Sequence, residues 1–204
     1  RQVGKTYILK EFAKNEYLDL AYFNFDHDEA LASLFKNSKD PKRIIEQLIL
    51  VHGKKIIPGE TLIFFDEIQE CSDALNSLKY FYENAPQYHI ICAGSLLGIA
   101  LHEGTSFPVG KVDFLELYPL SFREFLMAVT GIQFAKLLDS QDYKMITSFK
   151  QTYIEALKQY YFIGGMPEAV ENFTEERDFY EVREVQKRIL EAYEQDFSKY
   201  APLE

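Results

Sequence analysis

The chain has 204 residues, of which 47% are hydrophobic and 15% aromatic, a composition that excludes an intrinsically disordered protein and suffices for one compact core. Its 32 acidic and 22 basic residues give a formal net charge of -10. This charge repels phosphate backbones and anionic membranes, so neither a nucleic acid nor a membrane is an expected partner of this part of the chain. No apolar run reaches the ~18 residues of a membrane-spanning helix, and the first residues do not form a signal peptide, so we expect a cytoplasmic protein.

The first part of the chain alternates helical and extended patterns. Apolar residues recur at helical spacing in the segments 6–15, 43–52, 74–85 and 121–129. Continuous or alternating apolar residues predict strands at 17–26, 62–65, 88–95 and 112–118. Strands that alternate with helices in this way indicate an α/β fold with a parallel sheet.

The remainder of the chain is predicted to be helical. From about Gly131 onward the strand patterns stop, and we expect helices at 134–140, 145–161 and 181–197. The sequence therefore predicts a core at residues 1–130. Residues 131–204 would form a helical lid and the start of a connection to a further domain.

A triplet of glycine, lysine and threonine, Gly4-Lys5-Thr6, stands at the start of the first predicted helix. Phosphate-binding loops follow the pattern GxxxxGK[ST]: backbone amides surround the β-phosphate, the lysine reaches the β and γ oxygens, and the hydroxyl helps to hold magnesium. Only the second half of this pattern is present, because the first glycine would precede Arg1. The triplet alone is weak evidence, since it also occurs by chance.

Two acidic residues, Asp66 and Glu67, follow the buried strand 62–65. A nucleotide hydrolase needs a carboxylate at such a strand end to hold magnesium through water, and a second acid can activate the attacking water. The alternative is that both acids only cap the following helix, but their order after the triplet favours the nucleotide site.

Ser95 ends the next buried strand, where its hydroxyl could contact the attacking water or the γ-phosphate. A plain Gly-Ser turn is the alternative there.

The segments RQVGKT, FDEIQ, AGSLLG, FPVGKV and LYPLSFREFL, followed by GGMPEAV and DFSKY, extend over nearly the whole chain. Together they resemble a group of prokaryotic AAA-superfamily ATPases whose core usually continues into a C-terminal domain of unknown function. The resemblance implies a P-loop NTPase three-layer sandwich with strand order 5-1-4-3-2, truncated here at both ends, with its first strand missing, and followed by a helical lid. Loss of this central strand would leave backbone groups unpaired, so we expect residues 1–204 alone to fold poorly or to bind nucleotide weakly.

The resemblance also implies ATP and Mg²⁺ as cofactors. The triplet would bind the phosphates, with Thr6 also at the magnesium. Asp66 would be the Walker B ligand of magnesium, Glu67 the general base and Ser95 the sensor of the fourth strand.

Three further positions stay open. Gly165-Met166-Pro167 resembles the GxP element with which related signal-transduction ATPases place a lid proline against the nucleotide. Equally, the glycines can end one helix while Pro167 begins the next. By their position, Lys111 and Arg123 are candidates for a cation over the transferred phosphate, although each also fits an ordinary surface charge.

We therefore expect Mg-dependent ATP hydrolysis coupled to conformational change in an attached domain. The alternative is a nucleotide-gated interaction switch or scaffold with negligible turnover; Glu67 favours the enzyme, because a pure binding module needs no base. A helicase-like motor is disfavoured by the net charge and the lack of a basic aromatic stripe. The expected partners are ATP and the missing C-terminal domain, and a homo-oligomer remains open because AAA relatives often form rings.

Overall fold

The computed structural model describes residues 2–26, 28–94 and 110–200. The chain divides into two compact units, one of Lys5–Leu115 and one of Glu116–Glu204 together with Arg1–Gly4. This boundary precedes the core-to-lid boundary expected at residue 130, because α6 (Phe122–Thr130) packs with the later helices. Within the described ranges, no helix is both long and apolar enough to cross a membrane.

The first unit is built on a parallel sheet. In the described part of the chain its strands are β1 (Asp19–Asn24), β2 (Thr61–Asp66) and β3 (Ile90–Cys92), in the order β1-β2-β3. This confirms the predicted α/β fold, and the order is the one expected for the second, third and fourth strands. The register aligns Asn24 with Asp66, so the carboxyl ends of β1 and β2 meet at one edge of the sheet. β2 is buried along its whole length, as the uniformly apolar run in its sequence predicts.

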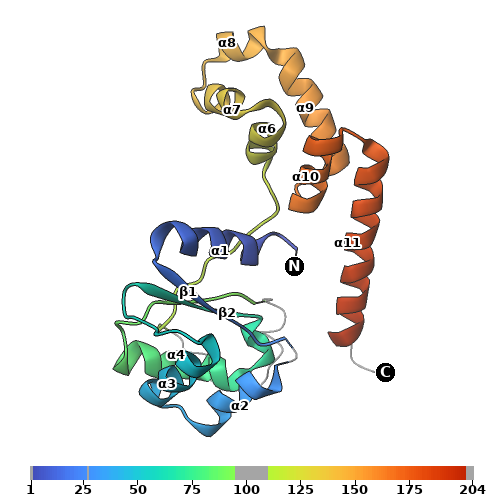
Figure 1. Ribbon diagram of the computed structural model, residues 1–204. Helices are drawn as coiled ribbons and strands as arrows, with labels where there is room; N and C mark the ends of the chain where they lie inside the picture. The colour runs from blue at the N-terminus through green and yellow to red at the C-terminus, as the bar shows by residue number, and fades with distance from the viewer. Residues whose placement is uncertain (1, 27, 95–109, 201–204) are drawn as a thin grey trace. The chain divides into compact units, whose positions relative to one another are not determined.

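Helices cover both faces of this sheet, which makes the unit a three-layer sandwich (Figure 1). One face carries α1 (Lys5–Glu16), and the other carries α2 (Glu29–Asn37), α3 (Pro41–His52) and α4 (Ser72–Asn84). A short 3-10 helix, η1 (Ile68–Glu70), begins two residues after the end of β2.

The core beneath α2, α3 and α4 is centred on four buried phenylalanines. Phe65 of β2 contacts Phe23, Phe25 and Phe35, with ring centroids 6.0, 5.6 and 5.5 Å apart. These tilted and edge-to-face pairs add to the free energy gained by burying the rings. The cluster joins β1, β2 and α2, so it fixes the strand ends on which the functional site depends.

The sequence patterns do not predict α2. In the structure, the Asp28 side chain accepts a hydrogen bond from the Leu31 backbone N at 2.8 Å and caps this helix. Leu31 and Phe35, one turn apart, are its buried residues. Leu31, Leu34 and Phe35 do stand at helical spacing, so the apolar pattern of this short segment could have identified the helix.

The second unit is helical. Besides α6 it contains α7 (Ile132–Asp139), α8 (Tyr143–Ser148), α9 (Lys150–Ile163), α10 (Pro167–Glu176) and α11 (Phe179–Tyr200). A core of Phe125, Ile163, Phe173 and Val182 joins α6, α9, α10 and α11. The helical prediction for the end of the chain is confirmed.

Two of the predicted elements are wrong. Residues 112–118 form no strand; their backbone is irregular, and Leu115 and Tyr118 are exposed. Apolar composition cannot make a strand without a neighbour for its backbone hydrogen bonds, and none of the strands in the described ranges pairs with this segment. The single helix expected at 145–161 is two helices, because the backbone leaves the helical conformation at Phe149 (φ -109°, ψ 18°) between α8 and α9.

The two faces of α3 give a direct test of this packing. Leu48 is fully buried at 0% exposure, whereas Leu50, two residues on, is 81% exposed. Leu48→Ala should lower the free energy of unfolding by about 2–5 kcal/mol through lost burial and a residual cavity. Leu50→Ala should change it by less than about 0.5 kcal/mol. Urea unfolding followed by circular dichroism measures both, and equal losses would contradict the assignment of the buried face.

An ion pair at the start of β1 makes stability depend on pH. His52 Nε2 lies 2.8 Å and Lys54 Nζ 3.3 Å from the Asp19 carboxylate, and the His52 hydrogen bond, followed by that of Lys54, holds the Asp19 pKa below its ordinary value of 3.8. A carboxylate with a lowered pKa stabilises the fold fully above that ordinary value and loses the effect as the pH falls through the lower, folded-state pKa.

Asp19→Asn should therefore cost stability at pH 6, by less than about 1 kcal/mol because solvent screens the pair. The difference from the native protein should shrink as the pH is lowered below 3.8. Urea midpoints at both pH values measure the effect, with Asp113→Asn at an exposed position as the control. A difference that grows on acidification would show that the sign is wrong.

Candidate functional site

The last residue of β2, Asp66, is a buried carboxylate that receives three hydrogen bonds. It is 3% exposed. The hydroxyls of Thr6 and Tyr22 each donate to its Oδ2 atom at 2.9 Å, and the backbone N–H of Glu67 donates to Oδ1 at 3.1 Å. A buried carboxylate is tolerated only when such donors compensate for lost hydration, so these three groups hold Asp66 at this edge of the sheet.

Thr6 reaches this carboxylate from the first turn of α1. The helix begins at Lys5, which confirms the predicted position of the triplet at a helix N-terminus. Gly4 precedes it with φ +84°, a left-handed backbone conformation that glycine adopts without strain. The structure therefore joins the end of the triplet to the acidic end of β2, as the sequence predicts for a magnesium site.

The Glu67 side chain contacts a different residue, Gln69, from those that contact the Asp66 side chain. Its backbone has φ 50° and ψ 42°, a left-handed conformation that is uncommon for residues other than glycine. The Gln69 side-chain amide Nε2 donates to Glu67 Oε2 at 2.5 Å, and Gln69 itself is 2% exposed. The second carboxylate is thus held by a buried amide, and it does not serve as a side-chain cap of η1.

The same amide lies against the end of β3. A Cβ atom added to Gly94 would stand 2.6 Å from Gln69 Oε1, which is too close for any side chain unless the amide moves. Gln69 therefore spans from the end of β2 to Gly94 at the end of β3. Ser95, the predicted sensor, lies outside the described residues.

The donor set around Asp66 fits magnesium. Among the described residues, no three His, Cys, Asp or Glu side chains come together as a metal site. Magnesium does not need such a cage, because it keeps several waters and is bound through one or two protein oxygens plus the substrate phosphates. The Thr6 hydroxyl and the Asp66 carboxylate supply oxygens of this kind.

The two candidate cations have other partners. Lys111 Nζ lies 3.6 Å from Glu83 and 4.8 Å from the ring centroid of Tyr82, both on α4. Arg123 binds Asp139 in the helical unit, with Nε to Oδ1 at 2.8 Å and Nη2 to Oδ2 at 2.5 Å. These contacts support the surface-charge interpretation for both residues.

Pro167 occupies the first turn of α10, after Gly164 has ended α9 with φ 77°. This matches the interpretation in which glycine stops one helix and proline starts the next.

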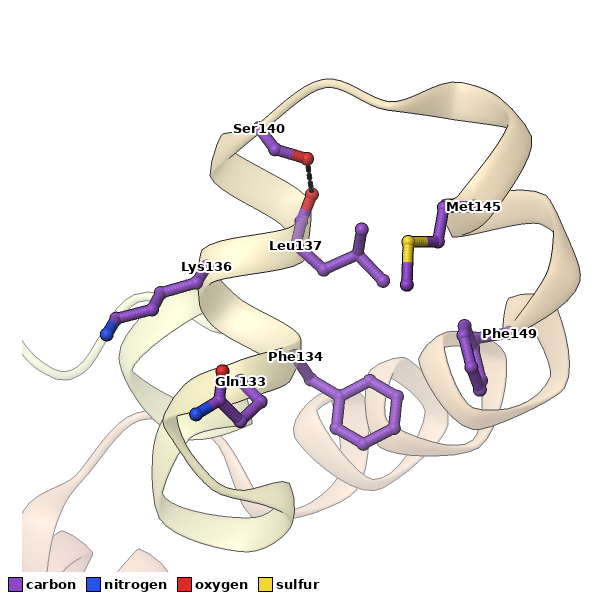
Figure 2. Close-up of a pocket in the computed structure, with 7 residues that line it drawn as sticks. All are labelled: Gln133, Phe134, Lys136, Leu137, Ser140, Met145 and Phe149. Carbon is purple, nitrogen blue, oxygen red and sulfur yellow. Dashed lines mark hydrogen bonds between the residues drawn. The ribbon is translucent and has the colours of Figure 1, made fainter.

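A cavity of about 390 Å³ in the helical unit is a separate feature (Figure 2). Phe134, Leu137, Met145 and Phe149 form its apolar wall, and Lys136 is its only charged lining residue. It gathers none of the predicted site residues and no pair of groups suited to acid–base chemistry, so the candidate site remains the edge of the sheet.

Comparison with known proteins is consistent with this geometry. A family model described as an AAA domain matches residues 1–126. The chain belongs to the AAA family. A second model, of a domain of unknown function (DUF8612), matches residues 154–204, within the helical unit. The Walker-type ATPase PABY2304 of Pyrococcus abyssi has a similar structure, with a TM-score of 0.57 and 15% identity, covering 99% of this chain and 69% of that one. None of the curated proteins matches the chain.

At this identity the structural likeness shows the fold alone: an α/β fold of the Walker-type ATPase kind. The AAA family adds nucleotide binding as the general property of such domains. Residue roles rest on the geometry of the site.

Two residues of the site escape sequence reasoning. Tyr22 lies in an apolar strand, where a tyrosine is indistinguishable from a core residue, and only the strand register shows that its hydroxyl reaches Asp66. Gln69 lies in the segment FDEIQ, two residues after Glu67, and a glutamine so close to the acidic pair is the signal that could have identified it.

The close approach at Gly94 leads to a prediction. In Gly94→Ala the Gln69 amide must move away, and because it ends a flexible side chain we expect the free energy of unfolding to change by less than about 1 kcal/mol. Its hydrogen bond to Glu67 should be lost, which would shift the Gln69 side-chain amide signals in ¹⁵N–¹H NMR spectra.

Gly53→Ala is the control, since no atom lies within 4 Å of a Cβ added at Gly53; its φ of +75° is positive, unlike that of Gly94. It should cost about 1 kcal/mol of stability through backbone strain and leave the Gln69 signals in place. Unchanged Gln69 signals in Gly94→Ala would contradict the contact.

Proposed function

We propose that this chain binds ATP with Mg²⁺ and hydrolyses it. The observation that carries the proposal is the hydrogen bond from Thr6, in the Gly-Lys-Thr triplet, to the buried Asp66 at the end of β2. Phosphate-binding loops and acidic strand ends are brought together in this way in nucleotide hydrolases, because the loop hydroxyl binds magnesium and the carboxylate holds it through water.

The triplet binds the phosphates: backbone N–H groups at the start of α1 and the Lys5 ammonium group face negative charge favourably. Thr6 and Asp66 hold the magnesium. When bound, the metal neutralises charge on the phosphate oxygens. Ser95 and Pro167 remain proposals for the sensor and for a lid contact to the nucleotide.

Glu67 is the general base of the proposed reaction. A base must be held at a defined place to take a proton from water, and the Gln69 amide fixes one of its carboxylate oxygens at 2.5 Å. The other oxygen, Oε1, is the acceptor that we assign to the attacking water. We further propose that turnover is coupled to conformational change in an attached domain.

The hydrogen bond between Gln69 and Glu67 also supports a second candidate function, a nucleotide-gated switch with negligible turnover. A carboxylate that stays bound to Gln69 in the nucleotide complex is a weaker base for water. In that case ATP binding alone would set the conformation that a partner recognises.

Two substitutions separate these functions. Lys5→Ala should weaken nucleotide binding at least about tenfold, because a charge-assisted contact to phosphate is lost. Glu67→Gln should preserve binding but lower the rate of phosphate release by about 10²–10⁴. Both are measured in protein expressed from its complete gene, with fluorescent-nucleotide anisotropy for binding and phosphate release for turnover.

Lys14→Ala and Glu16→Gln, exposed on the same helix α1, are the matched controls and should leave both quantities unchanged. Tight Lys5-dependent binding without turnover in the native protein would identify the switch. Binding that is insensitive to Lys5→Ala would rule out the triplet as the phosphate site.

A further inference from the structure

A tyrosine outside the sequence motifs contacts the proposed magnesium ligand. Tyr22 lies on β1 opposite Phe64 of β2, and the two rings pack edge-to-face with centroids 5.2 Å apart. Paired residues of neighbouring strands share one face of the sheet, and the Lys10 side chain of α1 lies over the Tyr22 ring, so this is the face that carries α1. From there the phenol hydroxyl reaches Asp66 Oδ2 at 2.9 Å.

The Tyr22 side chain is fixed from two further directions. Its hydroxyl oxygen accepts a hydrogen bond from Asn24 Nδ2 at 3.5 Å, so its proton is directed to Asp66. The Lys10 ammonium group lies 3.9 Å from the centre of its ring. Lys10 stands one helical turn after Thr6, so α1 contacts Asp66 directly through Thr6 and indirectly through Tyr22.

The acceptor capacity of Asp66 shows what the tyrosine does. A carboxylate offers about four lone-pair positions, two on each oxygen. Thr6 and Tyr22 use both positions on Oδ2, and the Glu67 backbone N–H uses one on Oδ1. Among the described residues no donor uses the remaining position, which is on Oδ1, so a metal-bound water would be accepted there. Without the phenol, Oδ2 regains a free position and the carboxylate can turn about its last bond.

We propose that Tyr22 is a positioning residue for magnesium: its hydroxyl occupies Asp66 Oδ2 and leaves Oδ1 as the oxygen that receives the metal-bound water. The proposal rests on the nucleotide function argued above. Thr6 fits the same arrangement, because a hydroxyl can donate its proton to Asp66 while its own lone pairs face the metal. Within the described ranges the Tyr22 hydroxyl bonds Asp66 and Asn24, so we assign its effect on the metal to its contact with Asp66.

Tyr22→Phe tests the proposal, since it keeps the ring, its packing on Phe64 and the Lys10 contact and removes only the hydroxyl. Tyr17→Phe is the matched control: the Tyr17 hydroxyl bonds His89 Nδ1 at 2.8 Å, in the same unit but away from Asp66. The probe is Mn²⁺ as a paramagnetic substitute for Mg²⁺, titrated with ADP into protein expressed from its complete gene, with bound metal measured by electron paramagnetic resonance.

We expect the apparent Kd for Mn²⁺ in the presence of ADP to rise about tenfold in Tyr22→Phe, the size typical of losing a hydrogen bond to a metal ligand. ADP affinity measured in EDTA should stay unchanged, and Tyr17→Phe should leave both values unchanged. A purely structural role would instead lower the melting temperature without changing the Mn²⁺ affinity.

Lys10→Met is a second variant, which leaves the hydroxyl in place and releases only the ring; it should weaken Mn²⁺ binding by less than Tyr22→Phe. An unchanged Mn²⁺ affinity in Tyr22→Phe, with ADP-dependent Mn²⁺ binding intact in the native protein, would overturn the role of Tyr22 alone. Absence of ADP-dependent Mn²⁺ binding in the native protein would overturn the proposed function and this inference together.

Discussion

The hydrogen bonding of the Asp66 carboxylate is the constraint that organises the first unit. A carboxylate that is 3% exposed must recover in hydrogen bonds what it loses in hydration. Its donors come from α1, from β1 and from the backbone after β2. Helix α1 must therefore dock with its first turn over the strand ends, and β1 must keep its register against β2. The docking of α1 and the register of β1 are both features of the fold, and both are needed for the hydrogen bonds to the Asp66 side chain.

The parallel sheet explains why these donors lie close to Asp66. Parallel strands end at the same edge, so residues that follow them in sequence gather there although they are far apart in the chain. The buried face beneath supplies the rigidity, since Phe65, next to Asp66, packs against three phenylalanines from β1, the turn after it and α2. Because this packing holds the strand, the position of the Asp66 carboxylate is fixed. The hydroxyls of Thr6 and Tyr22 must therefore be placed within hydrogen-bond distance of it.

The sequence predicts the parts of this arrangement that depend on local pattern. The buried run before Asp66 and the helix after the triplet are periodic or continuous signals, and both are where the patterns place them. A local sequence pattern does not show which strands pair or which distant side chains come into contact. Residues 112–118 have strand-like composition but no described strand to pair with, and Tyr22 looks like any strand aromatic until the register places its hydroxyl on Asp66. At the break between α8 and α9, the Phe149 ring packs edge-to-face on Phe134 of α7, and this contact too is absent from the local pattern.

The left-handed backbone at Glu67 explains how two adjacent carboxylates serve different purposes. In a continued strand, neighbouring side chains point to opposite faces of the sheet, and one of them would be buried in a core. The turn at Glu67 ends the strand and brings its side chain to Gln69 and the end of β3, while Asp66 keeps α1 and β1 as partners. A displacement of α1 therefore acts directly on the contacts of Asp66, whereas a displacement of the end of β3 acts on Glu67 through Gln69. Among the described residues the two hydrogen-bond systems meet at the 66–67 peptide, so the proposed metal ligand and the proposed base are held by separate sets of contacts.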